Sequence, residues 1–348
     1  AAAQSYQLTG QQVLKGLAVG IEVMCRLGLV VQKGVHSAGF HPTGVLGTMG
    51  ATAGVSAACN LTRNAQVNSA GIAGSMASGI IEYLADGTWT KRMHAGWAAQ
   101  NGLRATAMAL SGFTGPRTVY EGRHGLMFGF SSSENHDYSL LTDNLGQDWW
   151  AERIAFKPYA CGTMTQPFVD CAARLSKKVS IDDVVSLKCK VGEGTVHRLW
   201  EPLADKQMPS NAYAAKFSTP YCVAVGFLTE SAGLAEFTED VVQDKAVINL
   251  ARKVSYEIDP NDEYPKNYTG TICATLRDGR EVEETQPYLR GGINSPLSRA
   301  DILKKCKANF KYGGYNYEIV GVLSDLADNL KDNNKSLDLG FLNNIPSI

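Results

Sequence analysis

The sequence from residue 85 to residue 102 reads Ala-Asp-Gly-Thr-Trp-Thr-Lys-Arg-Met-His-Ala-Gly-Trp-Ala-Ala-Gln-Asn-Gly. Its first half holds a carboxylate, hydroxyls, cations and an imidazole, and small residues follow to residue 110. The small residues from 95 to 110 predict a helix, and the polar residues before them are typical of a turn and a helix N-terminus. Because a helix N-terminus attracts anions, we expect Thr90, Lys91 and His94 to lie at an anion-binding helix entrance. An ordinary charged loop before a helix is the alternative.

The bulk composition argues against several kinds of partner. The chain has 348 residues, 33 of them basic and 34 acidic, with no long basic run. We therefore expect more than one domain and neither nucleic acid nor a membrane as partner. The eight cysteines form no CxxC pair, which favours reduced thiols. The first ten residues lack the basic start of a signal peptide, so we expect a cytoplasmic protein. Lys15, Glu22 and Arg26 interrupt the longest apolar stretch on one helical face, as in a half-buried helix.

The first part of the chain has the pattern of helices rich in small residues. We expect helices at residues 11–31, 45–61, 65–83 and 95–111. Gly50 and Gly54 lie four residues apart, as do Gly71, Ser75 and Gly79, a spacing that lets helices approach closely.

The pattern becomes mixed after about residue 155. A strand is predicted at 184–191, a helix at 217–228, a partly strand-like segment at 246–258 and a hairpin at 268–289 that turns at Asp278-Gly279. Helices are predicted again at 298–310 and 321–331. The predicted fold is a multihelical domain plus a smaller α+β lid domain, with the C-terminus returning to the helical domain. The expected boundaries are 1–153 for the helical domain, 154–295 for the lid and 296–348 for the return.

Histidines and lysines are the candidates for chemistry. His36 and His41 lie in a glycine-punctuated loop before a predicted helix, although a lone loop histidine is commonly incidental, and their spacing does not suit a zinc site. Lys157 lies between an apolar triplet and a proline, where a buried ammonium would need an anion; a lysine that reaches to solvent is the alternative. Lys216 is a weaker case of the same kind.

The usual cofactor motifs are missing from the sequence. It holds no GxGxxG after a strand, no P-loop, no GxSxG and no HExxH, so we expect neither a cofactor nor a metal. Histidine and lysine without a cofactor suit proton abstraction next to a carboxylate, in which lysines stabilise the negative charge that develops.

Several segments together resemble the MmgE/PrpD family, which includes 2-methylcitrate dehydratases, cis-aconitate decarboxylases and an iminodisuccinate epimerase. The resemblance implies a helical domain and an α+β lid that close over a cofactor-free site, in a homodimer. It places the family's Phe-His-Pro histidine on His41, its Thr-Lys-x-x-His lysine on Lys91 and its Phe-Lys lysine on Lys157, with a loose match at His197. The segments that carry it are residues 40–50, 85–99, 112–116, 156–161, 216–221 and 276–279.

The chain also departs from the family pattern. Family members carry an earlier helical segment with an Asp-Asp-Thr-His type stretch and a second His-Pro, and the sequence holds neither. We therefore expect the N-terminal family segment to be lacking, and with it part of the acid–base set, which would lower the rate.

The function that these observations predict is a cofactor-independent lyase. We expect a dehydratase or decarboxylase that acts on a small di- or tricarboxylate such as 2-methylcitrate or cis-aconitate. His41 would transfer the proton, and Lys91 and Lys157 would bind carboxylate and stabilise charge. An epimerase or isomerase of a dicarboxylate, and a catalytically silent protein that binds a carboxylate or a partner, are the alternatives. The expected substrate-binding residues are Thr90, His94, His197 and Lys216.

Overall fold

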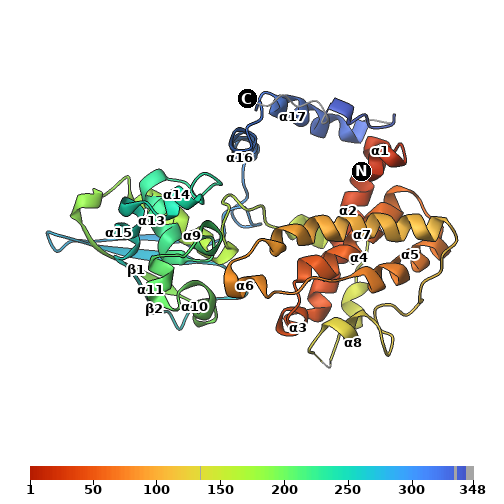
Figure 1. Ribbon diagram of the computed structural model, residues 1–348, viewed down its shortest axis with the longest axis horizontal. Helices are drawn as coiled ribbons and strands as arrows, with labels where there is room; N and C mark the ends of the chain where they lie inside the picture. Colours follow the sequence, from red (N-terminus) through yellow and green to blue (C-terminus); the bar gives the residue numbers. More distant parts are fainter. Residues whose placement is uncertain (134, 333–334, 342–348) are drawn as a thin grey trace. The chain divides into compact units, whose positions relative to one another are not determined.

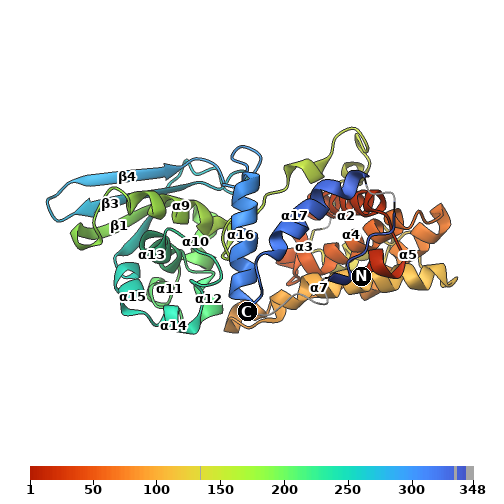
Figure 2. The same ribbon diagram turned by 90° about the horizontal axis from the view of Figure 1, so that it is seen from above.

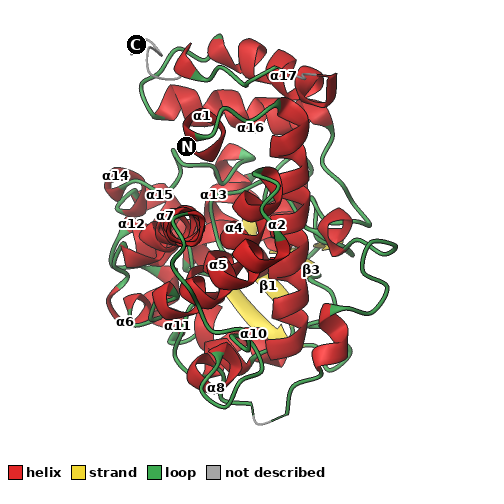
Figure 3. Cartoon of the chain, turned by 90° about the vertical axis from the view of Figure 1, so that its right-hand side faces the viewer, coloured by secondary structure: helices red, strands yellow, loops and turns green. Residues whose placement is uncertain are grey.

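The computed structural model describes residues 1–133, 135–332 and 335–341. The chain divides into two compact units. The first comprises Ala1–Arg153 and the described residues from Gly321 onward, and the second comprises Ile154–Val320. The four strands that the structure describes all belong to the second unit, and Figure 3 distinguishes them from the helices by colour. Residues 296–320, which the sequence pattern assigned to the helical return, group with the second unit.

The first unit is built around four long helices, α2 (Gly10–Val31), α4 (Pro42–Ala58), α5 (Arg63–Met76) and α7 (Thr90–Leu110). They lie side by side in Figure 1, with α4 in contact with the other three. Local signals start three of them: Thr9 caps α2 in a capping box, Pro42 occupies the first turn of α4, and Thr62 caps α5. The shorter helices of this unit are α1 (Ala2–Ser5), α3 (Gly34–Ser37), α6 (Tyr83–Asp86), α8 (Leu126–Phe130), η1 (Tyr138–Leu141), η2 (Trp150–Arg153), α17 (Ile319–Asn329) and η5 (Leu330–Asp332).

Glycines allow α2 and α4 to pack with almost no side chain between them. A Cβ added at Gly54 would lie 2.7 Å from the carbonyl oxygen of Gly16, and one at Gly50 would lie 2.7 Å from that of Gly20. The expected packing role of Gly50 and Gly54 is confirmed. The same helix carries His41 at its N-cap position.

The charged face of α2 was expected to be the exposed face of a half-buried helix, but it is mostly buried. Lys15 is exposed, but Glu22 and Arg26 are both buried and form an ion pair of 2.6 Å. The Arg26 guanidinium also donates to the carbonyl oxygens of Leu140, Asp143 and Asp148 at 2.9–3.1 Å. The pair is buried because the chain from 140 to 151 folds over α2, a contact that helical periodicity alone does not report.

The second unit is a four-stranded sheet in the order β2 (Val254–Ile258), β1 (Val184–Val191), β3 (Gly270–Leu276), β4 (Glu281–Gln286). β1 pairs with β2 in parallel and with β3 antiparallel, and β3 and β4 form the expected hairpin, with Gly279 at φ 86° in its turn. Figure 2 shows α9 (Gln166–Leu175), α13 (Thr219–Thr229) and α15 (Lys245–Ala251) on one face of this sheet. The core of the unit lies between these two layers.

Smaller elements complete the second unit. They are η3 (Thr163–Thr165), η4 (Ile181–Asp183), α10 (Glu193–Leu199), α11 (Leu203–Gln207), α12 (Ala212–Ala215), α14 (Glu239–Val242) and α16 (Arg299–Tyr312). The ambiguous segment 246–258 contains most of a helix and then a strand, α15 and β2. No helix among the described residues combines the length and apolar character that crossing a bilayer requires.

One helix prediction was wrong in a way that matters for the site. The helix predicted at 65–83 ends at Met76, and Ala77 is already extended. Gly79 follows at φ 128°, a conformation that residues with a Cβ rarely adopt, and Ile80 forms a bridge with Phe40. The chain between α5 and α6 is therefore an irregular segment that runs beside the start of α4.

Candidate active site

The start of α7 holds the polar residues that the sequence singled out. The helix begins at Thr90 rather than at residue 95, after Gly87 turns the chain at φ 68° and Trp89 takes the N-cap position without a side-chain hydrogen bond. Thr90, Lys91 and His94 therefore lie on the first two turns of the helix, at the positive end of its dipole. The expected helix entrance is present, and these residues belong to the helix itself.

His41 approaches the same place from α4. It is the N-cap residue before Pro42, and its backbone N–H donates to the carbonyl oxygen of Gly79 at 2.7 Å. Its Nδ1 lies 2.9 Å from Nδ1 of His94, and the two ring centroids are 5.1 Å apart. The two histidines, far apart in the sequence, form one hydrogen-bonded pair.

Tyr83 joins the pair from α6. It is buried, and its ring meets the rings of His41 and His94 edge-on at centroid distances of 5.8 and 5.9 Å. The ammonium of Lys91 lies 5.5 Å from the centre of the Tyr83 ring. Tyr83 could not be predicted as a site residue, because an aromatic residue on a four-residue helix gives no signal of what it faces.

The surroundings keep both imidazoles neutral. Burial, and then the positive charges of Lys91, His94 and His36, lower the pKa of His41 to about 4. Burial and Lys91 also lower the pKa of His94. At neutral pH each ring can therefore act both as a proton donor and as a proton acceptor.

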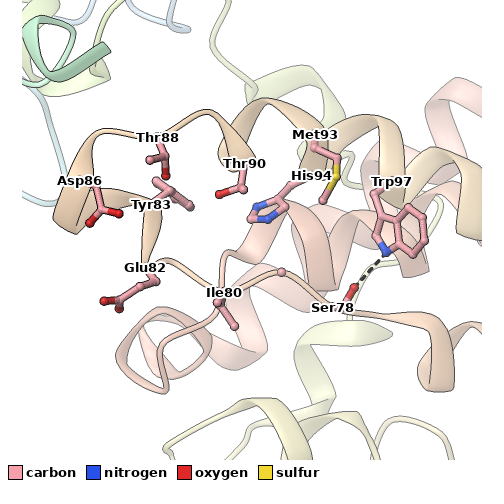
Figure 4. A pocket seen from close by; sticks show the side chains of 11 residues that line it. Ser78, Ile80, Glu82, Tyr83, Asp86, Thr88, Thr90, Met93, His94 and Trp97 are labelled. Atoms are coloured by element: carbon pink, nitrogen blue, oxygen red, sulfur yellow. Dashed lines mark hydrogen bonds between the residues drawn. The ribbon is translucent and has the colours of Figure 1, made fainter. Parts of the chain in front are cut away.

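A cavity of about 610 Å³ opens at the start of α7. Figure 4 shows the side chains of Thr90 and His94 close together on this helix, with Tyr83 beside them. Met93 and Trp97 add an apolar wall, and the Trp97 indole donates to the Ser78 hydroxyl at 2.9 Å. His41 is not among the described lining residues, so His94 is the histidine that faces the cavity. The lining residues are Ser78, Gly79, Ile80, Glu82, Tyr83, Asp86, Thr88, Thr90, Met93, His94 and Trp97.

The second unit holds Lys157 and Lys216. Lys157 is exposed as a whole residue, but its ammonium donates to the carbonyl oxygen of Cys161 at 3.2 Å. Desolvation lowers the pKa of Lys157; the Cys161 thiol opposes this shift, and the nearby Lys305 adds to it. The ammonium of Lys216 donates to the carbonyl oxygen of Ala160 at 3.0 Å and lies over the ring of Phe237.

The positive charges of both lysines lower the pKa of a buried cysteine, Cys161, that was not among the predicted site residues. Burial opposes ionisation of Cys161, but hydrogen bonds from Cys222 and Thr165 and the charges of Lys157 and Lys216 outweigh it and lower the pKa of its thiol. The signal that could have found it is the four-residue spacing from Lys157 within one segment.

His197 lies elsewhere in the second unit. It is exposed on α10, and its Nε2 accepts a hydrogen bond from the guanidinium of the adjacent Arg198 at 3.0 Å. The structure thus brings together His41, Lys91, His94 and Thr90 in the first unit. In the second unit it brings Lys157 and Lys216 together around Cys161. Among the described residues, no group of three or more histidine, cysteine or acidic side chains could hold a metal ion.

Comparison with known families defines the class of protein to which this fold and site belong. The MmgE/PrpD N-terminal domain matches residues 1–139, and the MmgE/PrpD C-terminal domain matches residues 159–316. The chain belongs to the MmgE/PrpD family, as the sequence segments predicted.

Individual relatives are similar at a modest level. The cis-aconitate decarboxylase of Mus musculus is 27% identical over 310 residues, which cover 87% of this chain and 62% of the relative. The cis-aconitate decarboxylase of Homo sapiens is 25% identical over 334 residues, 94% of this chain and 68% of the relative. That of Aspergillus terreus (strain NIH 2624 / FGSC A1156) is 25% identical over 324 residues, 87% of this chain and 65% of the relative. The chain spans about two thirds of the length of these relatives.

Proposed function

We propose that this chain acts as a cofactor-independent lyase on a small di- or tricarboxylate, with decarboxylation of cis-aconitate as the first reaction to test. The observation that carries the proposal is the pair of neutral histidines, His41 and His94, with Lys91 close enough to lower the pKa of both and with His94 lining a cavity. The names of the relatives support the choice of cis-aconitate among the carboxylic acids that such a site could take.

The chemistry of decarboxylation needs what this cluster offers. The bond between the CH2 carbon of cis-aconitate and its carboxylate breaks, and carbon dioxide leaves. The electron pair is delocalised through the adjacent C=C bond onto the far alkene carbon and its carboxylate. A neutral imidazole can then protonate one end of this allylic system, and the Lys91 ammonium at the positive end of α7 stabilises the negative charge before the proton arrives.

The remaining roles follow the same logic. Lys157 and Lys216, whose ammonium groups border one segment of the second unit, are proposed as the carboxylate-binding residues of that unit. Thr90, with its hydroxyl at the cavity edge, and His197 are proposed ligand contacts. Glu82 and Asp86 also line the cavity and would repel an anion, so the proposal places the carboxylate beside Thr90 and His94, at the start of α7.

The test is turnover in heavy water. The chain is incubated with cis-aconitate, 2-methylcitrate and iminodisuccinate, and NMR follows the products. We expect loss of carbon dioxide from cis-aconitate and a five-carbon dicarboxylate with one deuterium, either at the carbon that lost the carboxylate or at the former alkene carbon. Loss of water from 2-methylcitrate alone would make the chain a dehydratase. Deuterium in unreacted substrate without loss of either molecule would favour an isomerase, and no change in any acid would refute the proposal.

Matched lysine variants assign the activity to the site. Lys91→Met should lower kcat by about 10²-fold or more, as expected when a group that stabilises developing negative charge is removed. Lys157→Met should raise KM, because it removes a proposed carboxylate contact. Lys15→Met and Lys177→Met change exposed lysines of the first and second units and should leave turnover unchanged. Equal activity of all four variants would contradict the assigned roles.

A further inference from the structure

The contact between the two histidines restricts the protonation of both rings. The Nδ1 atoms of His41 and His94 lie 2.9 Å apart, a hydrogen-bond distance, so one of them carries the bridging hydrogen and the other accepts it. A neutral imidazole has a single N–H. The ring that donates through Nδ1 therefore has a bare Nε2, and the ring that accepts through Nδ1 has an Nε2–H. The pair always presents one acid and one base.

The backbone around Gly79 holds the rings in this arrangement. The carbonyl oxygen of Gly79 accepts the backbone N–H of His41. The His94 ring lies against the α-carbon of the same residue, where an added Cβ would be 3.3 Å from Nδ1, Cε1 and Nε2. Tyr83 closes a third side with edge-on contacts to both rings. The irregular segment after α5 thus positions both histidines at once.

The two rings differ in what they face. His94 is 3% exposed and lines the cavity. His41 is only half-buried and is not among the described lining residues. His94 therefore faces the space proposed for the ligand, and His41 is the ring that is more exposed to solvent.

We propose that His41 and His94 form a proton relay in which His94 gives its proton to the ligand while His41 passes the bridging proton to His94, so that neither ring becomes charged. This inference rests on the proposed function for its ligand. In the protonation step, His94 Nε2–H passes its proton to the ligand carbon, whose electron pair forms the new C–H bond. His94 Nδ1 takes the bridging proton from His41 Nδ1, and His41 Nε2 takes a proton from water. Both rings end neutral with their tautomers exchanged, and the water that gave its proton to His41 is left as hydroxide. In the return shift His94 Nε2 takes a proton from a solvent water, and the proton released at His41 Nε2 converts the first hydroxide back to water, so the net proton donor is one water molecule.

The relay differs from a purely structural hydrogen bond in what it requires of His41. A structural partner needs only an atom that donates or accepts near Nδ1, which an asparagine amide supplies. A relay needs a ring that takes a proton at one nitrogen while it gives one up at the other. His41→Asn separates these two roles, and His94→Gln removes the ring that faces the ligand.

The first measurement is independent of turnover. Nitrogen-15 NMR of the imidazoles at pH 7, assigned by the signals lost in His41→Asn and His94→Gln, should show two neutral rings with opposite tautomers. The same tautomer on both rings, or a charged ring, would overturn the proposal. If the chain turns over none of the acids, the proposed function fails, while the tautomers still decide whether the paired state exists.

The second measurement is the kinetics of the variants. His41→Asn and His94→Gln should each lower kcat by about 10²-fold or more, the contribution expected of a positioned acid or base, with KM little changed. The exposed His124→Asn is the matched control and should keep full activity. Full kcat in His41→Asn would overturn the relay and leave His41 as a structural partner of His94.

Discussion

His41 should remain neutral far below the pH at which a free histidine becomes charged. Its pKa of about 4 compares with an ordinary value of 6.5, and burial is the largest cause, followed by Lys91, His94 and His36. At about 1.36 kcal/mol per pKa unit, the folded protein disfavours the charged ring by at most about 3 kcal/mol. Partial exposure of His41 to solvent makes this figure an upper bound.

The sign of the resulting pH dependence follows from the lowered pKa. Above pH 6.5 the ring is neutral in both the folded and the unfolded chain, so it does not affect stability. Between pH 6.5 and about 4 the unfolded chain binds a proton that the folded chain does not, and the free energy of unfolding falls. Lys91→Met removes the second cause, so the pKa of His41 should rise and less stability should be lost on acidification.

NMR titration of the His41 ring protons measures the pKa directly, and urea unfolding at pH 7 and near pH 4 measures the linked stability. Lys15→Met, which removes an equal charge from an exposed position, should leave the titration of His41 unchanged. A His41 midpoint near 6.5 in the folded protein, or a midpoint that Lys91→Met does not move, would refute the electrostatic reasoning.

Three further predictions concern packing and the second unit. Arg26→Met leaves a buried carboxylate and three backbone carbonyls without their partner and should lower the free energy of unfolding, measured in urea, by about 3–5 kcal/mol. Arg153→Met breaks an exposed ion pair and should lower it by less than about 1 kcal/mol. Equal losses in the two variants would contradict the burial argument. Gly54→Val forces a side chain into the backbone of α2, so it should lower the melting temperature and reduce the free energy of unfolding by about 1–3 kcal/mol or more. Gly96→Ala adds a methyl group in open space on α7 and should leave stability unchanged or raise it. Ultraviolet titration should show a thiolate below the usual thiol range that disappears in Cys161→Ala, and its persistence there would assign the shift to another cysteine.

Local sequence signals predicted much of the fold. The strand at 184–191 and the hairpin with its Asp-Gly turn depend on alternation and turn chemistry within a few residues, and the structure has both. The helix starting at Thr90 was placed too late, because its polar first turns look like a loop when read alone. The helix before it was extended too far, because Gly79 can be either a packing residue within a helix or the residue that leaves one.

The candidate site was predicted by residue type and not by arrangement. Histidine and lysine chemistry singled out His41, Lys91 and His94 in separate segments, but nothing in their spacing shows that His41 and His94 share a hydrogen bond. That contact depends on the backbone of Gly79, which the sequence pattern placed inside a helix. His41, which was expected to transfer the proton, is not among the described residues that line the cavity, whereas His94 is.

Lys91 links the protonation of the pair to the charge of the ligand. Its positive charge lowers the pKa of both His41 and His94. A carboxylate that pairs with Lys91 would cancel this effect and add a negative charge near the rings, so the pKa of both histidines should rise, with His36 and Tyr83 as the other groups that face them. Binding of a carboxylate below pH 6 should therefore take up protons, measurable by calorimetry in buffers of different ionisation enthalpy. A binding enthalpy that is the same in every buffer would show that the pair does not respond to the ligand, and Lys91→Met should abolish most of the uptake.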